Sequence, residues 1–258
     1  MVDLYQFVLP VLFASLMAAI VASIEIGWWL GSRAKNRGGA NIFALEQSLI
    51  GLLALMIGFT FFMALTRFEA RREAVVNEAN AIGTTALRAR LIPEPHRTES
   101  LKLLQEYARI RVEGSRSGRS LIDLPEVITR SNEIQEALWL QAKASAAKET
   151  VLIPVSLFIQ SLNEMIDSQG KRLAHLRNRI PTVVLLALVA MTVVSTGIAG
   201  YAGGVDLKRT RTPIYLIGLL LCGLVYVVLD LDRPAAGVIQ IDQQPMHDVV
   251  SSMAAFSD

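Results

Sequence analysis

The stretch of sequence that decides the fold is GLLALMIGFTFFMALTRFEARR, residues 51–72. Residues 51–66 are uncharged and largely apolar, as the interior of a bilayer requires. They run directly into a charged segment that contains Arg67, Glu69, Arg71 and Arg72. No Gly, Pro or polar turn signal separates the two parts, and helices end at such signals. The sequence therefore predicts one helix that crosses a membrane and continues into water.

The composition is that of a membrane protein with a charged part. Of the 258 residues, 52% are hydrophobic and 19% are charged, and the mean hydropathy is +0.43. A soluble domain of this length is usually more charged and less apolar. The net charge of +2, with no basic tract interleaved with aromatics, argues against a nucleic-acid partner. The single cysteine, Cys222, excludes an intrachain disulfide and the cysteine-based zinc patterns.

Four windows lack charge over roughly the 20 residues that a membrane helix needs. They are Phe7–Leu30, in which Glu25 is the exception, Gln47–Thr66, Ile180–Val205 and Thr212–Leu229. We therefore expect an all-α membrane protein with four transmembrane helices and a long helical extramembrane domain between the second and third. The expected parts are a first helix pair (1–66), the extramembrane domain continuous with the membrane helices (67–179), a second helix pair (180–230) and a C-terminal tail (231–258).

The segment between the second and third spans is expected to be helical throughout, because strand-type alternation is absent. The helix that begins in the second span should continue to about Ile92, where Pro93 and Pro95 stop it. Further helices are expected over about 95–116, 125–143 and 149–179. Long helices with apolar stripes need partners, either within the chain or from other subunits.

No residue pattern indicates catalysis or a resident metal. The HExxH, GxSxG, P-loop and GxGxxG motifs are absent. The histidines lie at no ligand spacing from one another or from a cysteine, which favours structural or solvent roles for His96, His175 and His247. Asp230 and Asp232 could begin a calcium loop, but the other ligands of the EF-hand pattern do not follow. A turn at the membrane surface, with Asp232 near Arg233, is favoured, and we expect no enzyme activity and no cofactor.

Glu25 is the one ionisable residue inside a predicted span. A carboxylate in that position is a functional candidate, because the burial of its charge is expensive. The neighbouring Trp28 and Trp29 suit the membrane–water interface, however, and this offers a second interpretation. Glu25 would then reach water, Arg33 or a polar neighbour such as Gln47. The sequence leaves both interpretations open.

The opening stretch also places several residues on one face of the predicted helix. At helical spacing this face carries Gly51, Leu55, Gly58, Phe59, Phe62 and Thr66. An aromatic face belongs more often to helix packing than to a pore lining. Gly51 and Gly58 also fit the close approach of another helix. Spacing alone therefore favours packing without excluding a pore.

Basic residues are concentrated in the two short loops. One loop carries Arg33, Lys35 and Arg37, and the other carries Lys208, Arg209 and Arg211. The tails before Phe7 and after Asp230 contain one basic residue between them, Arg233. By the positive-inside rule both short loops are cytoplasmic. We therefore expect a multi-pass protein of the cell (inner) membrane with its helical domain outside the cytoplasm.

The pair Gly58-Phe59, followed by an apolar stretch and then by Thr66, Arg67 and Phe68, resembles the second transmembrane helix of the bestrophin chloride channels. In that family a Gly-Phe pair leads through an apolar stretch ending in Thr or Asn to Arg-Trp. The order of two spans, a long helical segment, two spans and a tail agrees. RFEARREAVVNEANAIGTTALRARLIPEP (67–95) and LDLDRPAAGVIQI (229–241) resemble the bestrophin-like membrane proteins of bacteria, a family with little assigned function.

The resemblance implies a pentamer whose second helices form a hydrophobic neck, with apolar side chains at three positions four residues apart. Matched through Gly58-Phe59, these positions are Gly51, Leu55 and Phe59, of which Gly51 departs from the pattern and would widen the neck. The acidic cluster of the bestrophin calcium clasp is not reproduced by DLDRP (230–234). The charge bias also implies an orientation opposite to that of bestrophins, whose large domain is cytoplasmic.

The function implied by the resemblance is that of an oligomeric, pentameric ion channel with small anions as the permeants. Its partners would be the lipid bilayer, copies of itself and small inorganic ions. Besides the neck, the pathway is expected to involve the helix-two residues Gly58, Phe62, Thr66 and Arg67. The alternative is a non-conducting membrane sensor or scaffold whose helical domain binds a ligand or partner.

Overall fold

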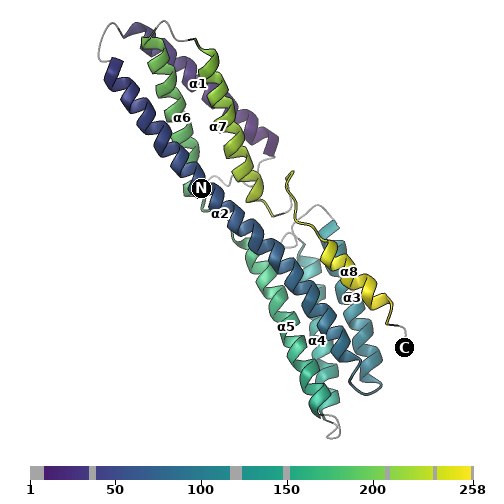
Figure 1. Ribbon diagram of the computed structural model, residues 1–258. Coiled ribbons are helices and arrows are strands. Elements are labelled where there is room, and N and C mark those ends of the chain that lie inside the picture. The colour runs from purple at the N-terminus through teal and green to yellow at the C-terminus, as the bar shows by residue number, and fades with distance from the viewer. Residues whose placement is uncertain are drawn as a thin grey trace. The chain divides into compact units, whose positions relative to one another are not determined.

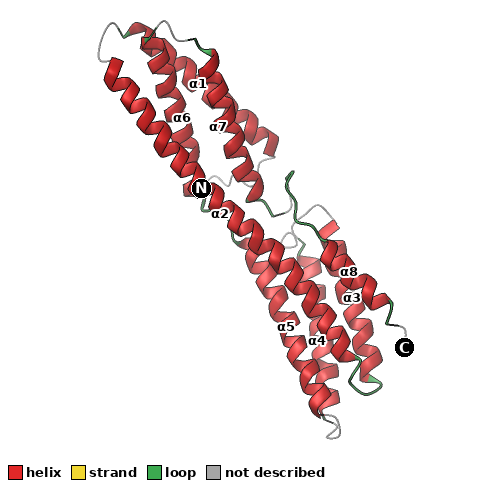
Figure 2. Ribbon diagram, in the orientation of Figure 1, coloured by secondary structure: helices red, strands yellow, loops and turns green. Residues whose placement is uncertain are grey.

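The computed structural model describes residues 9–34, 39–116, 124–147, 152–206, 210–234 and 237–256. These residues form helices and connecting segments, and no strand occurs among them (Figure 2). The helices (Figure 1) are α1 (Leu9–Arg33), α2 (Gly39–Ala89), α3 (His96–Arg116), α4 (Pro125–Ala146), α5 (Leu152–Arg177), α6 (Thr182–Val205), α7 (Thr212–Leu231) and α8 (Gln244–Ala254). The prediction of an all-α protein is confirmed.

The described residues contain four helical segments that are long and apolar enough to cross a membrane. They lie in α1, in α2, in the stretch Ile153–Val205 that covers α5 and α6, and in α7, and each includes most of one predicted charge-free window. Some residues that entered the predictions lie outside the described part of the chain, namely Phe7, Lys35, Arg37, Lys208 and Arg209.

Helix α2 is uninterrupted over 51 residues, from Gly39 to Ala89. At about 1.5 Å per residue it is about 77 Å long, more than twice the roughly 30 Å thickness of a bilayer core. The predicted continuation of the second span as one helix is confirmed. The helix ends slightly before the expected Ile92, because turn hydrogen bonds to the carbonyls of Arg88 and Ala89 lead the chain into Pro93.

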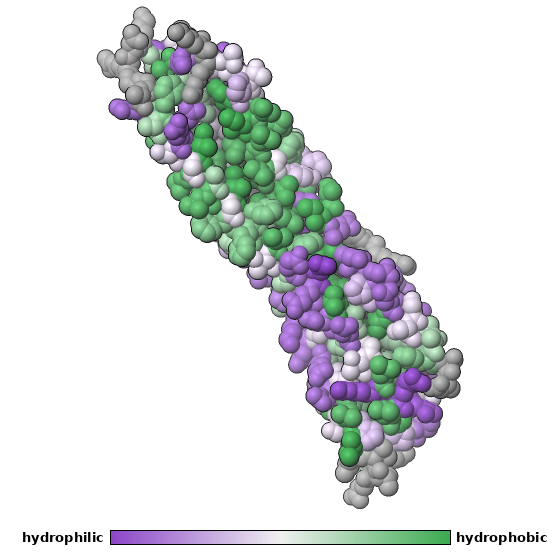
Figure 3. Space-filling view, viewed as in Figure 1, coloured by the Kyte–Doolittle hydropathy of each residue, from purple (hydrophilic) through white to green (hydrophobic). Residues whose placement is uncertain are grey.

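The chain divides into two compact units. The first unit comprises residues Met1–Thr66 and Arg179–Arg233, and in it α1, α6 and α7 pack together. The second unit comprises residues Arg67–Asn178 and Pro234–Asp258. In Figure 3 hydrophobic residues cover most of the visible surface of the first unit, and hydrophilic residues cover much of the second.

Glycines allow the backbones of α1 and α6 to touch in the first unit. A Cβ atom added at Gly27 would lie 2.1 Å from the carbonyl oxygen of Gly197. One added at Gly200 would lie 2.3 Å from the carbonyl oxygen of Ile24. Without a hydrophobic driving force between helices in lipid, close backbone approach through small residues provides the packing energy.

Replacement of Gly27 by Ala is therefore expected to destabilise the first unit, because a backbone atom cannot move aside as a flexible side chain can. Overpacking costs typically about 1–3 kcal/mol, and contact with backbone places this site at the upper end. Thermal unfolding of the detergent-purified protein measures the loss as a lower Tm. Gly223→Ala in α7 is the matched control, since nothing lies within 4 Å of its added Cβ. Equal Tm values for the two variants would contradict the close packing of α1 on α6.

The second unit has a hydrophobic core built from α2, α3, α4, α5 and α8. Its largest contributors include Ile82, Leu104, Leu138, Phe158 and Leu162. Helix α8 adds Met246, Val249 and Met253 to this core. The segment after the fourth span, expected only as a tail, thus folds back as a helix. The spacing of those three apolar residues was the signal for it.

Candidate functional site

Helix α2 has two different faces in the first unit. Leu53, Ile57, Thr60 and Ala64 are buried against other parts of the chain. The opposite face carries side chains that the single chain leaves uncovered. The exposed fractions there are 56% for Leu55, 63% for Phe59 and 66% for Phe62.

The other predicted residues of this face are also exposed. Gly51, Gly58 and Thr66 are open to the surroundings, and nothing lies within 4 Å of a Cβ added at either glycine. Close helix approach at these glycines, which the sequence allows, does not occur among the residues that the structure describes. The Thr66 hydroxyl donates to the carbonyl of Phe62 at 2.9 Å, so its polar group is satisfied within the helix.

Arg67 does not join this face. Its Nε donates to Oδ1 of Asn178 at 3.4 Å, and its side chain is only partly exposed. The structure therefore brings together six of the seven helix-two residues expected along the pathway and leaves Arg67 apart. We define the exposed face by Gly51, Leu55, Gly58, Phe59, Phe62 and Thr66 and call it the α2 face.

Glu25 lies on α1 and contacts Arg211, which directly precedes α7, and Tyr215 in the first turn of α7. It accepts a hydrogen bond from the Tyr215 hydroxyl, and its Oε2 lies 3.3 Å from Nη1 of Arg211. These contacts at the start of α7 take the place of the suggested partners Arg33 and Gln47, because the sequence did not predict that this part of the chain lies beside Glu25. The Glu25 side chain is 43% exposed, so its charge is paired without being buried. This geometry favours the interpretation in which Glu25 meets a polar neighbour.

The acidic residues at the end of α7 are buried, with Asp230 in the last turn of the helix and Asp232 directly after it. The backbone N–H of Arg233 donates to the carbonyl of Asp230, and Oδ2 of Asp232 accepts from the backbone N–H of Ile180 at 3.0 Å. The described residues contain no group of three or more His, Cys, Asp or Glu side chains that could hold a metal ion.

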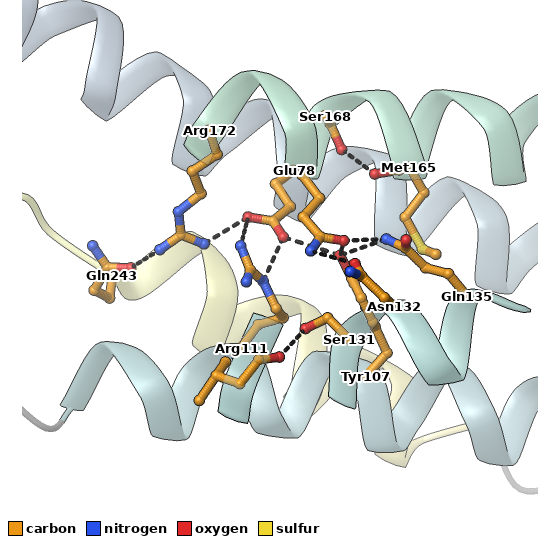
Figure 4. Close-up of polar contacts among 12 residues, drawn as sticks. Glu78, Tyr107, Arg111, Ser131, Asn132, Gln135, Met165, Ser168, Arg172 and Gln243 are labelled. Carbon is orange, nitrogen blue, oxygen red and sulfur yellow. Dashed lines mark hydrogen bonds and ion pairs between the residues drawn. The ribbon is translucent and has the colours of Figure 1, made fainter. Parts of the chain in front are cut away.

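The second unit contains a buried cluster of charged side chains that the sequence did not predict (Figure 4). Glu78 of α2 lies between two guanidinium groups, and all three side chains are almost fully buried. Arg111 of α3 donates to both carboxylate oxygens, from Nε at 2.7 Å and from Nη2 at 3.1 Å. Arg172 of α5 donates from Nη1 to Oε2 at 2.7 Å. One carboxylate thus joins three helices.

A chain of uncharged groups extends this cluster. The Tyr107 hydroxyl lies 3.2 Å from Oε1 of Glu78 and 3.2 Å from Oε1 of Gln169. Gln135 donates to the same oxygen of Gln169. On the other side, Nη2 of Arg172 donates to Oε1 of Gln243 at 2.9 Å, which ties the segment before α8 to the cluster. The cluster therefore connects α2, α3, α4 and α5 with the segment that precedes α8.

Electrostatics hold Glu78 in its charged form. Burial alone would raise the pKa of this carboxyl, but the charges of Arg111 and Arg172 outweigh burial and lower the pKa from 4.5 to about 2. Burial and the nearby Glu78 raise the pKa of Tyr107, which keeps its phenol protonated and able to donate. The signal in the sequence was a charged residue at a core position, since Glu78 stands between Val75 and Ile82 on the buried stripe.

The histidines are dispersed. Nδ1 of His96 lies 2.8 Å from Oε1 of Gln141, which gives it a hydrogen-bonding role. His175 lies beside a groove between α2 and α5, and His247 lies in α8.

The model of the Bestrophin-like domain family matches residues 47–246 of the chain. Similar crystal structures include a bacterial bestrophin homologue from Klebsiella pneumoniae, with 13% identity, a TM-score of 0.65 and coverage of 93% of this chain and 94% of that chain. Another is the crystal structure of a membrane protein with a proline-to-alanine substitution, with 15% identity, a TM-score of 0.67 and coverage of 95% of each chain. At these identities the likeness shows the fold alone. No curated protein matches the chain.

Proposed function

Since the chain belongs to the bestrophin-like family of membrane proteins, we propose that it forms a homo-oligomeric channel, a pentamer, that conducts small anions. The observation that carries this proposal is the exposed, apolar α2 face of a helix whose other side is packed. In a ring of subunits, the α2 faces of all copies surround one axis. Leu55 and Phe59, one turn apart, then form an apolar neck that gates by dewetting.

The width of the neck at each level follows from the size of the side chain at that level. Gly51 lacks a side chain, so one level of the neck is wider than the levels of Leu55 and Phe59. Beyond the neck, Phe62 continues the apolar lining, and Thr66 supplies the first hydroxyl of the face. Arg67, turned toward Asn178, acts as a bridge within the second unit in this proposal and not as a lining residue.

The proposal is tested with the purified protein in liposomes loaded with chloride. A chloride gradient should dissipate faster than in protein-free liposomes, and replacement of chloride by a large organic anion should abolish the difference. Equal rates with and without protein would overturn the proposal. They would leave the rival function, a non-conducting membrane sensor or scaffold.

We also propose that the helical domain lies outside the cytoplasm, because the basic residues of the short loops favour cytoplasmic loops. Cysteine labelling tests this in a Cys222→Ala background, since Cys222 is buried. A cysteine at exposed Glu136 in α4 should react with an impermeant maleimide on cells whose outer membrane, where one exists, is permeabilised. One at exposed Thr210, between α6 and α7, should react only after the inner membrane is opened. The reverse pattern would place the domain in the cytoplasm.

A further inference from the structure

Aromatic and basic side chains gather at one end of the first unit, where α1 ends and α7 begins. The guanidinium carbon of Arg33, the last residue of α1, lies 3.7 Å from the centre of the Trp29 ring. The guanidinium carbon of Arg211, directly before α7, lies 4.9 Å from the centre of the Trp28 ring. A guanidinium group that stacks on an aromatic face still presents N–H donors around its edge, in the geometry that phosphate oxygens accept.

The two guanidinium groups lie at a similar level of the first unit. Trp28 and Trp29 are consecutive, so their backbone positions differ by only about 1.5 Å along the axis of α1. Helix α6 makes room for the Trp28 ring through Gly203, where an added Cβ would lie 2.6 Å from that ring. Tryptophan is enriched at the membrane–water interface. Both arginines therefore reach the level at which lipid headgroups lie.

The charges at this end of the unit do not cancel. Arg211 is paired with Glu25, whose Oε2 lies 3.3 Å from its Nη1, and the Tyr215 hydroxyl donates to the same carboxylate. Arg33 is exposed, and no carboxylate among the described residues forms an ion pair with it. Two guanidinium groups thus face one carboxylate, and the positive charge of Arg33 remains available to an anion.

The surface of α1 beside Arg33 is apolar. Ile26 and Leu30 lie about two turns and one turn before Arg33, and at about 100° per residue they fall within about 60° of it around the helix axis. Both side chains are exposed. A free inorganic anion gains nothing from such a surface, whereas a phospholipid bound through its phosphate covers the surface with its acyl chains. The combination of exposed cation and exposed apolar surface therefore favours a lipid.

We propose that Arg33 and Arg211 bind the phosphate of an anionic phospholipid at this end of the first unit. Basic pockets between membrane helices bind anionic headgroups in this way, through charge-assisted hydrogen bonds to phosphate oxygens. The acyl chains lie along α1 over Ile26 and Leu30. A zwitterionic lipid brings an ammonium group, which the charge of Arg33 repels, so the site prefers a headgroup such as phosphatidylglycerol. Lipid binding here requires no conduction and is separate from the proposed function.

Tryptophan fluorescence measures this preference, because the chain contains only 3 tryptophans. Trp139→Phe removes the one in α4 and leaves Trp28 and Trp29 as reporters. The purified full-length variant is reconstituted in phosphatidylcholine with a small fraction of a lipid that carries bromine near the headgroup end of its acyl chains. One basic residue near the membrane surface favours an anionic lipid about fivefold. Brominated phosphatidylglycerol should therefore quench at about one-fifth of the mole fraction that brominated phosphatidylcholine requires.

Further variants separate the charge of Arg33 from other effects. Arg33→Gln should abolish the preference, and Arg33→Lys, which keeps the charge, should retain it. Lys102→Gln is the matched control, because it removes one exposed basic residue from α3 in the second unit. It should leave the preference unchanged. Each ratio compares two lipids in the same variant, so a change in the intrinsic fluorescence of Trp29 cancels.

Several results would overturn the proposed site. One is equal quenching by the two lipids in the Trp139→Phe protein, and another is a preference that survives Arg33→Gln. Quenching by neither lipid would mean that another copy of the chain covers this surface. Relief of quenching by millimolar inorganic phosphate would mean that the arginines bind the free anion and not a lipid.

Discussion

Replacement of both Leu55 and Phe59 by Ala is expected to raise chloride flux through reconstituted liposomes about tenfold or more, which corresponds to a barrier lower by about 1.4 kcal/mol. The reason is that truncation of two apolar side chains on the α2 face widens the neck and lets water fill it. Neither side chain is needed for packing within the chain, since both are more than half exposed. The variant should therefore assemble normally.

Two further variants sharpen this prediction. Leu220→Ala in α7 is the matched control, because Leu220 is equally apolar and 61% exposed but lies on another membrane helix. It should leave flux unchanged. Gly51→Leu should reduce flux, because the position is open within the chain and a side chain there adds a third apolar level. If the double variant conducts at the wild-type rate, Leu55 and Phe59 do not form the neck.

Replacement of Glu78 by Gln is expected to destabilise the second unit by about 3–5 kcal/mol, the cost of breaking a buried ion pair by removal of one partner. The variant keeps the shape of the side chain and leaves the buried charges of Arg111 and Arg172 without their shared carboxylate. Such a loss is a large share of the stability of a typical domain, roughly 5–15 kcal/mol. Denaturant unfolding of the detergent-purified protein, followed by circular dichroism, measures it.

The control for this variant is Glu133→Gln. Glu133 forms an exposed ion pair with Arg130, and exposed pairs contribute about 0–1 kcal/mol. A similar small change in both variants would show that the buried cluster does not stabilise the unit.

The same cluster predicts a dependence of stability on pH. The pKa of Glu78 is lowered from 4.5 to about 2 in the folded chain. A carboxyl with a depressed pKa contributes stability that is fully present above its unfolded pKa and is lost as pH falls through the folded value. The wild type should therefore lose stability between about pH 4.5 and pH 2, and Glu78→Gln should lack this part of the loss.

The membrane fold followed from the sequence because its signals are local. Uncharged windows of membrane length and the proline pair at residues 93 and 95 defined the spans and the end of α2. The same spacing argument identified which residues share the exposed side of α2. Helical spacing could not determine what covers the exposed side of α2, because the covering groups come from residues distant in the sequence or from other subunits.

The contacts that the sequence did not predict are long-range contacts between polar groups. Glu78 meets Arg111 and Arg172 from helices far apart in the sequence, and no spacing rule joins them. Glu25 meets Tyr215 and Arg211 for the same reason. In each case the position of a charge on one helix was visible, but its partner depended on how the helices pack.

A channel of the proposed kind requires that the exposed face of α2 surrounds an axis shared by several copies of the chain. The most direct test is an image of the purified full-length particle, at a resolution that places the helices. We expect a closed ring, with α2 innermost and Phe59 of every copy directed toward an axial opening. A dimer without an axial opening, or a ring in which the α2 face is directed outward to lipid, would contradict it.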